Sequence, residues 1–72
     1  MTTIEEIEMA VNQQIKAQEI KGFAYGIGND LLVYVKGVFS QNVIEWIVNN
    51  FDEIVSYEID FDFNCIIYNY VG

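Results

Sequence analysis

The residues with the clearest potential for chemistry are carboxylates in an alternating stretch near the end of the chain. In VSYEIDFDFNC (55–65), apolar residues alternate with polar ones, which include Glu58, Asp60 and Asp62. Residues two apart on a strand share a face and lie about 6.6–6.8 Å apart along it. Two carboxylates so spaced could serve as general acid and base. A hydrolase of this kind would need a deep pocket between Asp60 and Asp62.

The residues that would support catalysis or metal binding are missing. The sequence has no histidine and no arginine, and its one thiol, Cys65, has apolar neighbours typical of a small buried side chain. DFDFN starts like a calcium loop, but Cys65 replaces the required glycine and Val71 the required glutamate. YGIGND lacks the spacing of a phosphate loop. The sequence therefore predicts a protein that is not an enzyme and that has no metal or cofactor.

The charge balance is strongly acidic. Eleven acids and three lysines give a net charge of −8, and residues 37–72 contain six acids and no base. Such a surface repels phosphate backbones and anionic lipids and attracts basic proteins. We therefore expect a basic partner surface and no direct binding of nucleic acid or membranes. Acidity that serves only solubility is the alternative, and the sequence leaves it open.

The length and composition predict one small domain with a dense core. The chain has 72 residues, of which 53% are hydrophobic and 15% aromatic, and its single cysteine excludes an internal disulfide. Domains of this size are marginally stable alone, so we expect a homodimer. The acidic N-terminus does not resemble a signal peptide, no apolar run is long enough to cross a bilayer, and the free thiol suits a reducing compartment. These features predict a cytoplasmic protein.

A helix is predicted over residues 4–20. Thr3 and Glu6 can form a capping box, and Gly22 is a suitable stop. The apolar stripe that should face the core comprises Ile4, Ile7, Val11 and Ile15. The residues expected to face water include Glu5, Glu8, Asn12, Lys16 and Glu19.

A hairpin should follow, with Asn29 and Asp30 as its loop. This register would pair Ile27 with Leu32 and Tyr25 with Tyr34. The face that results, which we predict as the dimer interface, carries Phe23, Tyr25, Ile27, Leu32 and Tyr34. The small residues of the opposite face, among them Ala24 and Gly26, would let a helix approach the sheet closely.

A second helix is predicted from a cap at Ser40 to about residue 52, with Phe39 and Ile44 as a hydrophobic staple. Trp46 lies about 130° from the centre of its apolar face, which is unusual for the only tryptophan. Either a partner contact or a place at the edge of the core would explain it. Strands should follow at 54–60 and 65–71, joined by a bend at 60–64. The alternation assigns to the inner face Val55, Tyr57, Ile59, Phe61, Phe63 and Cys65.

The predicted fold is thus an α+β domain in the order αββαββ, with a four-stranded antiparallel sheet and two helices on one face. The order suggests an internal αββ repeat, residues 3–36 and 40–71. Residues 7–13 align with 44–50, with Ile, Glu, Val and Asn matched. Helical periodicity alone could produce such a match, so coincidence is the alternative.

Two functions remain after these exclusions. In size, acidity and lack of motifs the chain resembles phage-encoded antagonists of host defence nucleases, such as anti-CRISPR proteins; this resemblance is compositional and implies no residue roles. The leading hypothesis is an inhibitor that blocks a basic nucleic-acid-binding surface of a nuclease or effector complex. The predicted contact residues are Glu45, Trp46, Asp52, Glu53, Glu58, Asp60 and Asp62. The alternative is an adaptor module that self-associates through its aromatic face or a strand edge.

Overall fold

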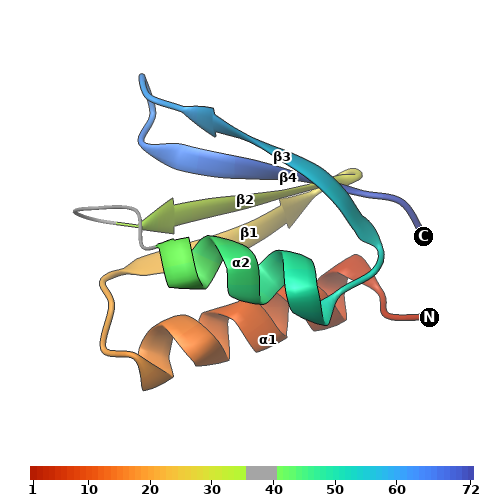
Figure 1. Ribbon diagram of the computed structural model, residues 1–72, viewed down its shortest axis with the longest axis horizontal. Helices are drawn as coiled ribbons and strands as arrows, with labels where there is room; N and C mark the ends of the chain where they lie inside the picture. The colour runs from red at the N-terminus through yellow and green to blue at the C-terminus, as the bar shows by residue number, and fades with distance from the viewer. Residues whose placement is uncertain (36–40) are drawn as a thin grey trace.

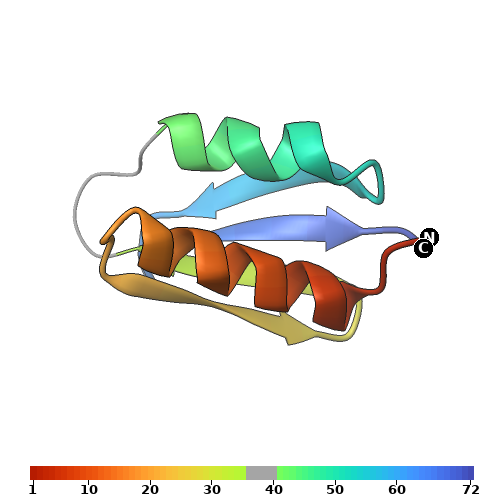
Figure 2. The same cartoon turned by 90° about the horizontal axis from the view of Figure 1, so that it is seen from below.

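A computed structural model describes the backbone of residues 1–35 and 41–72, and the side chains of residues 1–34 and 45–72. The elements are α1 (Ile4–Ala17), β1 (Gly22–Ile27), β2 (Asp30–Val35), α2 (Gln41–Asn50), β3 (Ile54–Asp60) and β4 (Cys65–Tyr70). The strands form one antiparallel sheet in the order β1-β2-β4-β3. Both helices lie on one face of it (Figures 1 and 2), so the predicted class, element order and layering are confirmed. No helix in the described ranges is long and apolar enough to cross a membrane.

The two halves of the chain occupy equivalent places in the sheet. β2 and β4 pair at its centre, whereas β1 and β3 form its edges. Helix α1 packs against β1, and α2 packs against β3. Two copies of an αββ unit would give this arrangement, although duplication of the sequence stays a prediction.

The core lies between the helices and the inner face of the sheet. Helix α1 contributes the predicted stripe of Ile7, Val11 and Ile15, all buried, and α2 contributes Ile47. The sheet contributes Ala24, Leu31, Val33, Ile54, Ile66 and Tyr68. The hydroxyl of Tyr68 is buried without a hydrogen-bond partner among the described residues, and burial raises the pKa of this phenol well above its usual value.

Helix α1 begins as predicted and ends earlier than predicted. The capping box of Thr3 and Glu6 is complete. The last helical residue is Ala17, because Glu19 takes a left-handed conformation with φ 56°. Its N–H donates to the Lys16 carbonyl, and the Ile20 N–H donates to the Ile15 carbonyl, which together form a Schellman cap. The predicted stop at Gly22 is therefore wrong.

The first hairpin has a different loop from the one expected. Its two loop residues are Gly28 and Asn29, and the positive φ falls on Gly28, the position where type II′ turns favour glycine. Tyr25 consequently pairs with Leu32, and Phe23 with Tyr34. The predicted pairing of Tyr25 with Tyr34 is wrong by two residues. A shift of two keeps every side chain on its predicted face.

The predicted inner face of the second hairpin is correct at its middle and wrong at both ends. Tyr57 and Ile59 lie on the helix side, opposite Tyr68 and Ile66. A bulge between Ile54 and Ser56 leaves Val55 exposed. Phe61 and Phe63 belong to the turn and are 77% and 71% exposed. The turn also changes the register, because Cys65 pairs with Asp60 and shares the opposite face with it.

Helix α2 ends at Asn50, close to the predicted end at about residue 52. Ser40 and Phe39, the predicted cap and half of the predicted staple, lie outside the described residues, as does the side chain of Ile44. Trp46 is partly buried, packs against the core and meets the ring of Phe51 edge-on at 5.7 Å. The described side chain of Trp46 therefore belongs to the edge of the core.

Two polar side chains of α1 cover the outer edge of β1. The Asn12 amide donates to the Ala24 carbonyl at 3.0 Å and accepts from the Ala24 N–H at 2.8 Å. The Glu8 carboxylate accepts from the Gly26 N–H at 2.6 Å. A Cβ on Gly26 would meet Glu8 Oε2 at 3.0 Å and Ile4 at 3.4 Å, so glycine permits this close approach. The expectation that Glu8 and Asn12 simply face water is wrong; both are half-buried.

We predict that Asn12→Ala lowers the free energy of unfolding by about 1–3 kcal/mol, because two half-buried backbone groups of Ala24 lose their partners. Urea denaturation measures the change. Gln13→Ala is the control, since Gln13 is exposed on the same helix and should change stability by less than about 0.5 kcal/mol. Equal effects of the two substitutions would contradict a specific role of the amide.

Candidate functional site: the open face of the sheet

The face of the sheet away from the helices has no layer over it in the described structure (Figure 1), and we name it the open face. Strand pairing arranges its side chains in three rows that each cross β1, β2, β4 and β3 in that order. The rows are Phe23–Tyr34–Cys65–Asp60, Tyr25–Leu32–Ile67–Glu58 and Ile27–Asp30–Asn69–Ser56. The open face is therefore aromatic at its β1 edge and acidic at its β3 edge.

The aromatic side contains all five residues predicted as a dimer interface. Phe23, Tyr25 and Ile27 are 54%, 51% and 54% exposed, although they stand on a strand. The ring of Phe23 stacks on that of Tyr34 with centroids 4.9 Å apart and an interplanar angle of 25°. Leu32 and Tyr34 are partly covered. Exposed apolar side chains gathered on one face commonly mark an interaction surface.

The acidic side contains Glu58 and Asp60 on β3, with Asp62 in the adjoining turn. Glu58 and Asp62 are exposed, and none of the four strands contains a lysine. Alternate positions on a strand hold the first two carboxylates about 6.6–6.8 Å apart along β3. Beside them is a shallow, open hollow of about 330 Å³, lined by Glu58, Ile59, Asp60, Phe61, Asp62 and Ile67. This hollow is not the deep pocket that a hydrolase using Asp60 and Asp62 would need.

Asp60 also shapes the turn that follows it. Its Oδ1 atom accepts hydrogen bonds from the backbone N–H groups of Asp62 at 3.0 Å and Phe63 at 3.3 Å. Asn64 then takes a left-handed conformation with φ 52°, which asparagine tolerates well. These contacts supply the bend that the unbroken alternation did not locate. Replacing Asp60 would therefore change the turn as well as the charge.

Cys65 is buried between the two sides of the open face. Burial raises the pKa of its thiol, the nearby Asp60 carboxylate raises it further, and a hydrogen bond with Tyr34 acts in the opposite direction. A thiol that is buried and protonated is a poor nucleophile, so the prediction of a small buried side chain is confirmed. Among the described residues, no group of three or more His, Cys, Asp or Glu side chains is placed to hold a metal ion.

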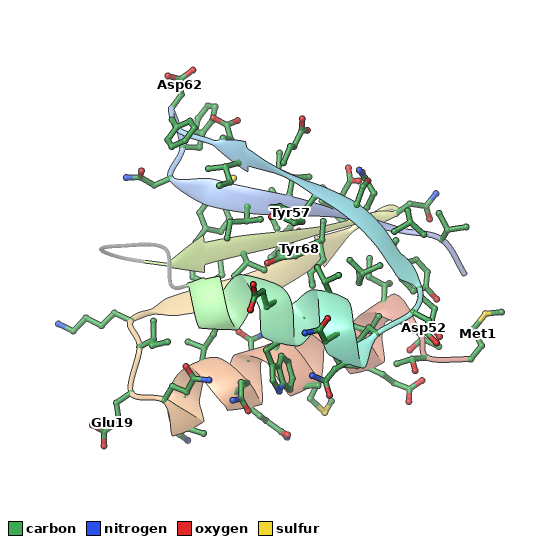
Figure 3. The ribbon with its side chains drawn as sticks, viewed as in Figure 1. Met1, Glu19, Asp52, Tyr57, Asp62 and Tyr68 are labelled. Carbon is green, nitrogen blue, oxygen red and sulfur yellow. The ribbon has the colours of Figure 1, made fainter. Side chains whose placement is uncertain are left out.

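The other predicted contact residues lie elsewhere. Glu45 and Trp46 are on α2, in the layer that covers the inner face. Asp52 and Glu53 lie between α2 and β3, and Figure 3 shows Asp52 near Met1 at the opposite end of the molecule from Asp62. The structure thus brings Glu58, Asp60 and Asp62 together with the aromatic residues, and separates the remaining four from them.

Glu53 joins the two ends of the chain. Its carboxylate accepts from the Thr2 N–H at 2.8 Å, and its carbonyl accepts from the Val71 N–H at 2.8 Å. The Tyr70 hydroxyl donates to the Thr2 carbonyl at 2.8 Å. The Thr2 hydrogen bond is the largest of the effects that lower the pKa of Glu53. This carboxylate is already used within the fold.

Three residues of the open face were missed by the sequence reasoning, namely Asp30, Ile67 and Asn69. Asp30 adds a carboxylate to the third row, and Ile67 separates Leu32 from Glu58 in the second. The sequence pattern predicts Asp30 in the loop, and a loop residue has no assigned face of the sheet. The spacing of two between Asp30 and Leu32 was the signal that could have identified its face.

We predict that Glu53→Gln weakens the dependence of stability on acid pH. The folded-state pKa of Glu53 lies below its unfolded value, so its contribution is fully present above the unfolded pKa and is lost as the pH falls through the folded pKa. Urea unfolding at pH 7 and pH 3 should show a smaller loss of stability for the variant than for the natural chain. Asp52→Asn is the control, because Asp52 is exposed in the same turn. An equal change in both variants would contradict the role of the Thr2 contact.

Comparisons with known proteins found no relative of this chain, which matches no protein-family model, no curated protein and no solved structure. The function must therefore be argued from the open face itself.

Proposed function

We propose that the protein is a small, non-enzymatic inhibitor that covers a basic, nucleic-acid-binding surface of another protein. The observation that supports this proposal is the composition of the open face, where exposed aromatic residues and carboxylates lie together on strands without a lysine. The partner class is a nuclease or effector complex of the kind that phage anti-defence proteins oppose. Both the protein and this partner would be located in the cytoplasm.

The two sides of the open face suit different parts of such an interface. Carboxylates on a strand form a row of negative charge that can occupy cationic side chains otherwise bound to phosphates. Such contacts raise the rate of association and make it depend on salt. Tyrosine and phenylalanine supply apolar contact area at the centre of an interface, where most binding free energy is concentrated. Together they favour a partner groove that is both basic and partly apolar.

We predict that Glu58→Gln with Asp62→Asn weakens binding to the partner about tenfold, at roughly 0.7 kcal/mol for each carboxylate. The partner is first captured from a host lysate at low salt and released at high salt. The dissociation constant is then measured with the purified partner, together with displacement of a labelled oligonucleotide from it. Asp60 is left unchanged because its side chain holds the turn.

The matched control is Glu5→Gln with Glu19→Gln, which removes two exposed carboxylates from the α1 side of the molecule. We expect this control to bind within about twofold of the natural chain. Equal losses in both double variants would mean that net charge alone matters and would contradict a site on the open face. Capture of no nucleic-acid-binding protein at low salt would contradict the proposed function.

Self-association is the second candidate, and the exposure of Phe23, Tyr25 and Ile27 favours it. The covered edge of β1 disfavours pairing through that strand, and the exposed apolar side chains favour a dimer through the aromatic side of the open face. Each chain carries a charge of −8, so such a dimer should strengthen as salt screens the repulsion.

We predict for this candidate that the molecular mass by light scattering doubles between low and high salt at micromolar concentration. Tyr25→Thr should keep the protein monomeric, because it removes a half-exposed ring from the shared face while keeping a residue suited to strands. A monomer at every salt concentration would exclude the dimer. Salt-strengthened self-association and salt-weakened partner binding are opposite signatures, so one salt series separates the two functions.

A further inference from the structure

We infer that the surface recognised by the open face presents arginine side chains, at least two of them, in preference to lysine. This inference rests on the proposed function and adds the chemistry of the partner. It depends on the arrangement of aromatic, aliphatic and acidic side chains in the rows of the open face. The carboxylates favour arginine through bidentate hydrogen bonds, and the aromatic rings add a preference that carboxylates alone do not supply.

The second row shows the arrangement most clearly. It runs from Tyr25 through Leu32 and Ile67 to Glu58, one residue on each strand. Neighbouring strands are about 4.7–4.9 Å apart, so three steps separate the ring from the carboxylate by about 14–15 Å at the backbone. This span exceeds the reach of one cationic side chain. A partner that uses the whole row must therefore present at least two cations.

The aromatic side distinguishes arginine from lysine. A guanidinium is planar and weakly hydrated, so it can lie flat on the half-exposed ring of Tyr25 or on the Phe23–Tyr34 stack. An ammonium is compact and strongly hydrated, and it gains less from such contact. Leu32 and Ile67, which lie between Tyr25 and Glu58 in the row, offer apolar surface to the methylene stems of such arginine side chains.

The acidic side favours the same residue. A guanidinium can donate two parallel hydrogen bonds to one carboxylate, whereas an ammonium binds as a point charge. Glu58 is exposed at the end of the second row, beside the shallow hollow. An arginine placed there would donate hydrogen bonds to Glu58 from its guanidinium and contact Ile67 with its methylene groups.

Charge complementarity decides between this occupant and a second copy of the chain. A second copy carries the same charge of −8, has no arginine, and would bring another set of carboxylates to the face. An arginine-bearing surface satisfies both sides of the open face at once.

The test compares octa-arginine and octa-lysine peptides, which have equal length and charge. Each is labelled with fluorescein, and binding to the full chain is followed by anisotropy at low salt. We expect octa-arginine to bind about fivefold more tightly than octa-lysine. Tyr25→Thr should reduce this ratio to between one and two, chiefly by weakening the arginine peptide. Glu58→Gln should weaken both peptides and leave an arginine preference.

Met9→Ala is the control, because Met9 is exposed on α1 outside the open face, and the ratio should not change. Circular dichroism establishes that each variant is folded. Binding of both peptides with equal affinity would overturn the arginine preference and leave the proposed basic partner in place. An unchanged ratio in folded Tyr25→Thr would overturn the role of the aromatic side. Failure of both peptides to bind, together with failure to capture a basic partner, would overturn the inference and the proposed function together.

Discussion

The packing of α1 on β1 is the contact on which the rest of the molecule depends. The buried stripe of Ile7, Val11 and Ile15 fixes which face of the sheet is inner, and Gly26 lets the helix come close enough for Glu8 and Asn12 to reach the strand edge. Those two side chains supply hydrogen bonds that an edge strand would otherwise seek from another chain. One helix therefore provides core packing and protection of an edge together. A domain this small has few residues with which to build a stable fold. A residue that combines such roles reduces the number of residues that stability requires.

Once the inner face is fixed, the composition of the open face follows from the strand pairing. Two helices cover one side of a four-stranded sheet, and the chain has no third layer among its described elements. Alternation then sends Phe23, Tyr25 and Ile27 outward from β1, and Glu58 and Asp60 outward from β3. The central pairing of β2 with β4 sets the two groups about three strand spacings apart. Residues far apart in sequence thus form one surface with two chemically distinct sides.

The sequence allowed the element order and the faces to be predicted because periodicity reports burial directly. The stripe of α1 and the alternation of β1 and β2 each follow one rule over several residues. The errors arose where a single residue or a tertiary contact determines the local structure. Gly28, rather than Asp30, takes the loop position, and Glu19 ends a helix in a conformation usually left to glycine. Asn12 resembles a solvent-facing residue in the helical pattern, and only the position of β1 gives its amide a partner.

The candidate site was predictable in its parts and not in its assembly. The acids of 58–62 and the aromatic residues of the first hairpin were both recognised, but as two surfaces with separate purposes. Their union depends on the strand order β1-β2-β4-β3, which no local pattern encodes. Trp46 lies in the helix layer and Glu53 just before β3, so both are separated from the acids at the far end of that strand, although they are close in sequence. A row of carboxylates alone would be explained by solubility. Its position on a sheet face whose other edge is aromatic is the reason for our proposal that the face recognises a basic surface, since solubility does not account for the exposure of Phe23 and Tyr25 on the same face.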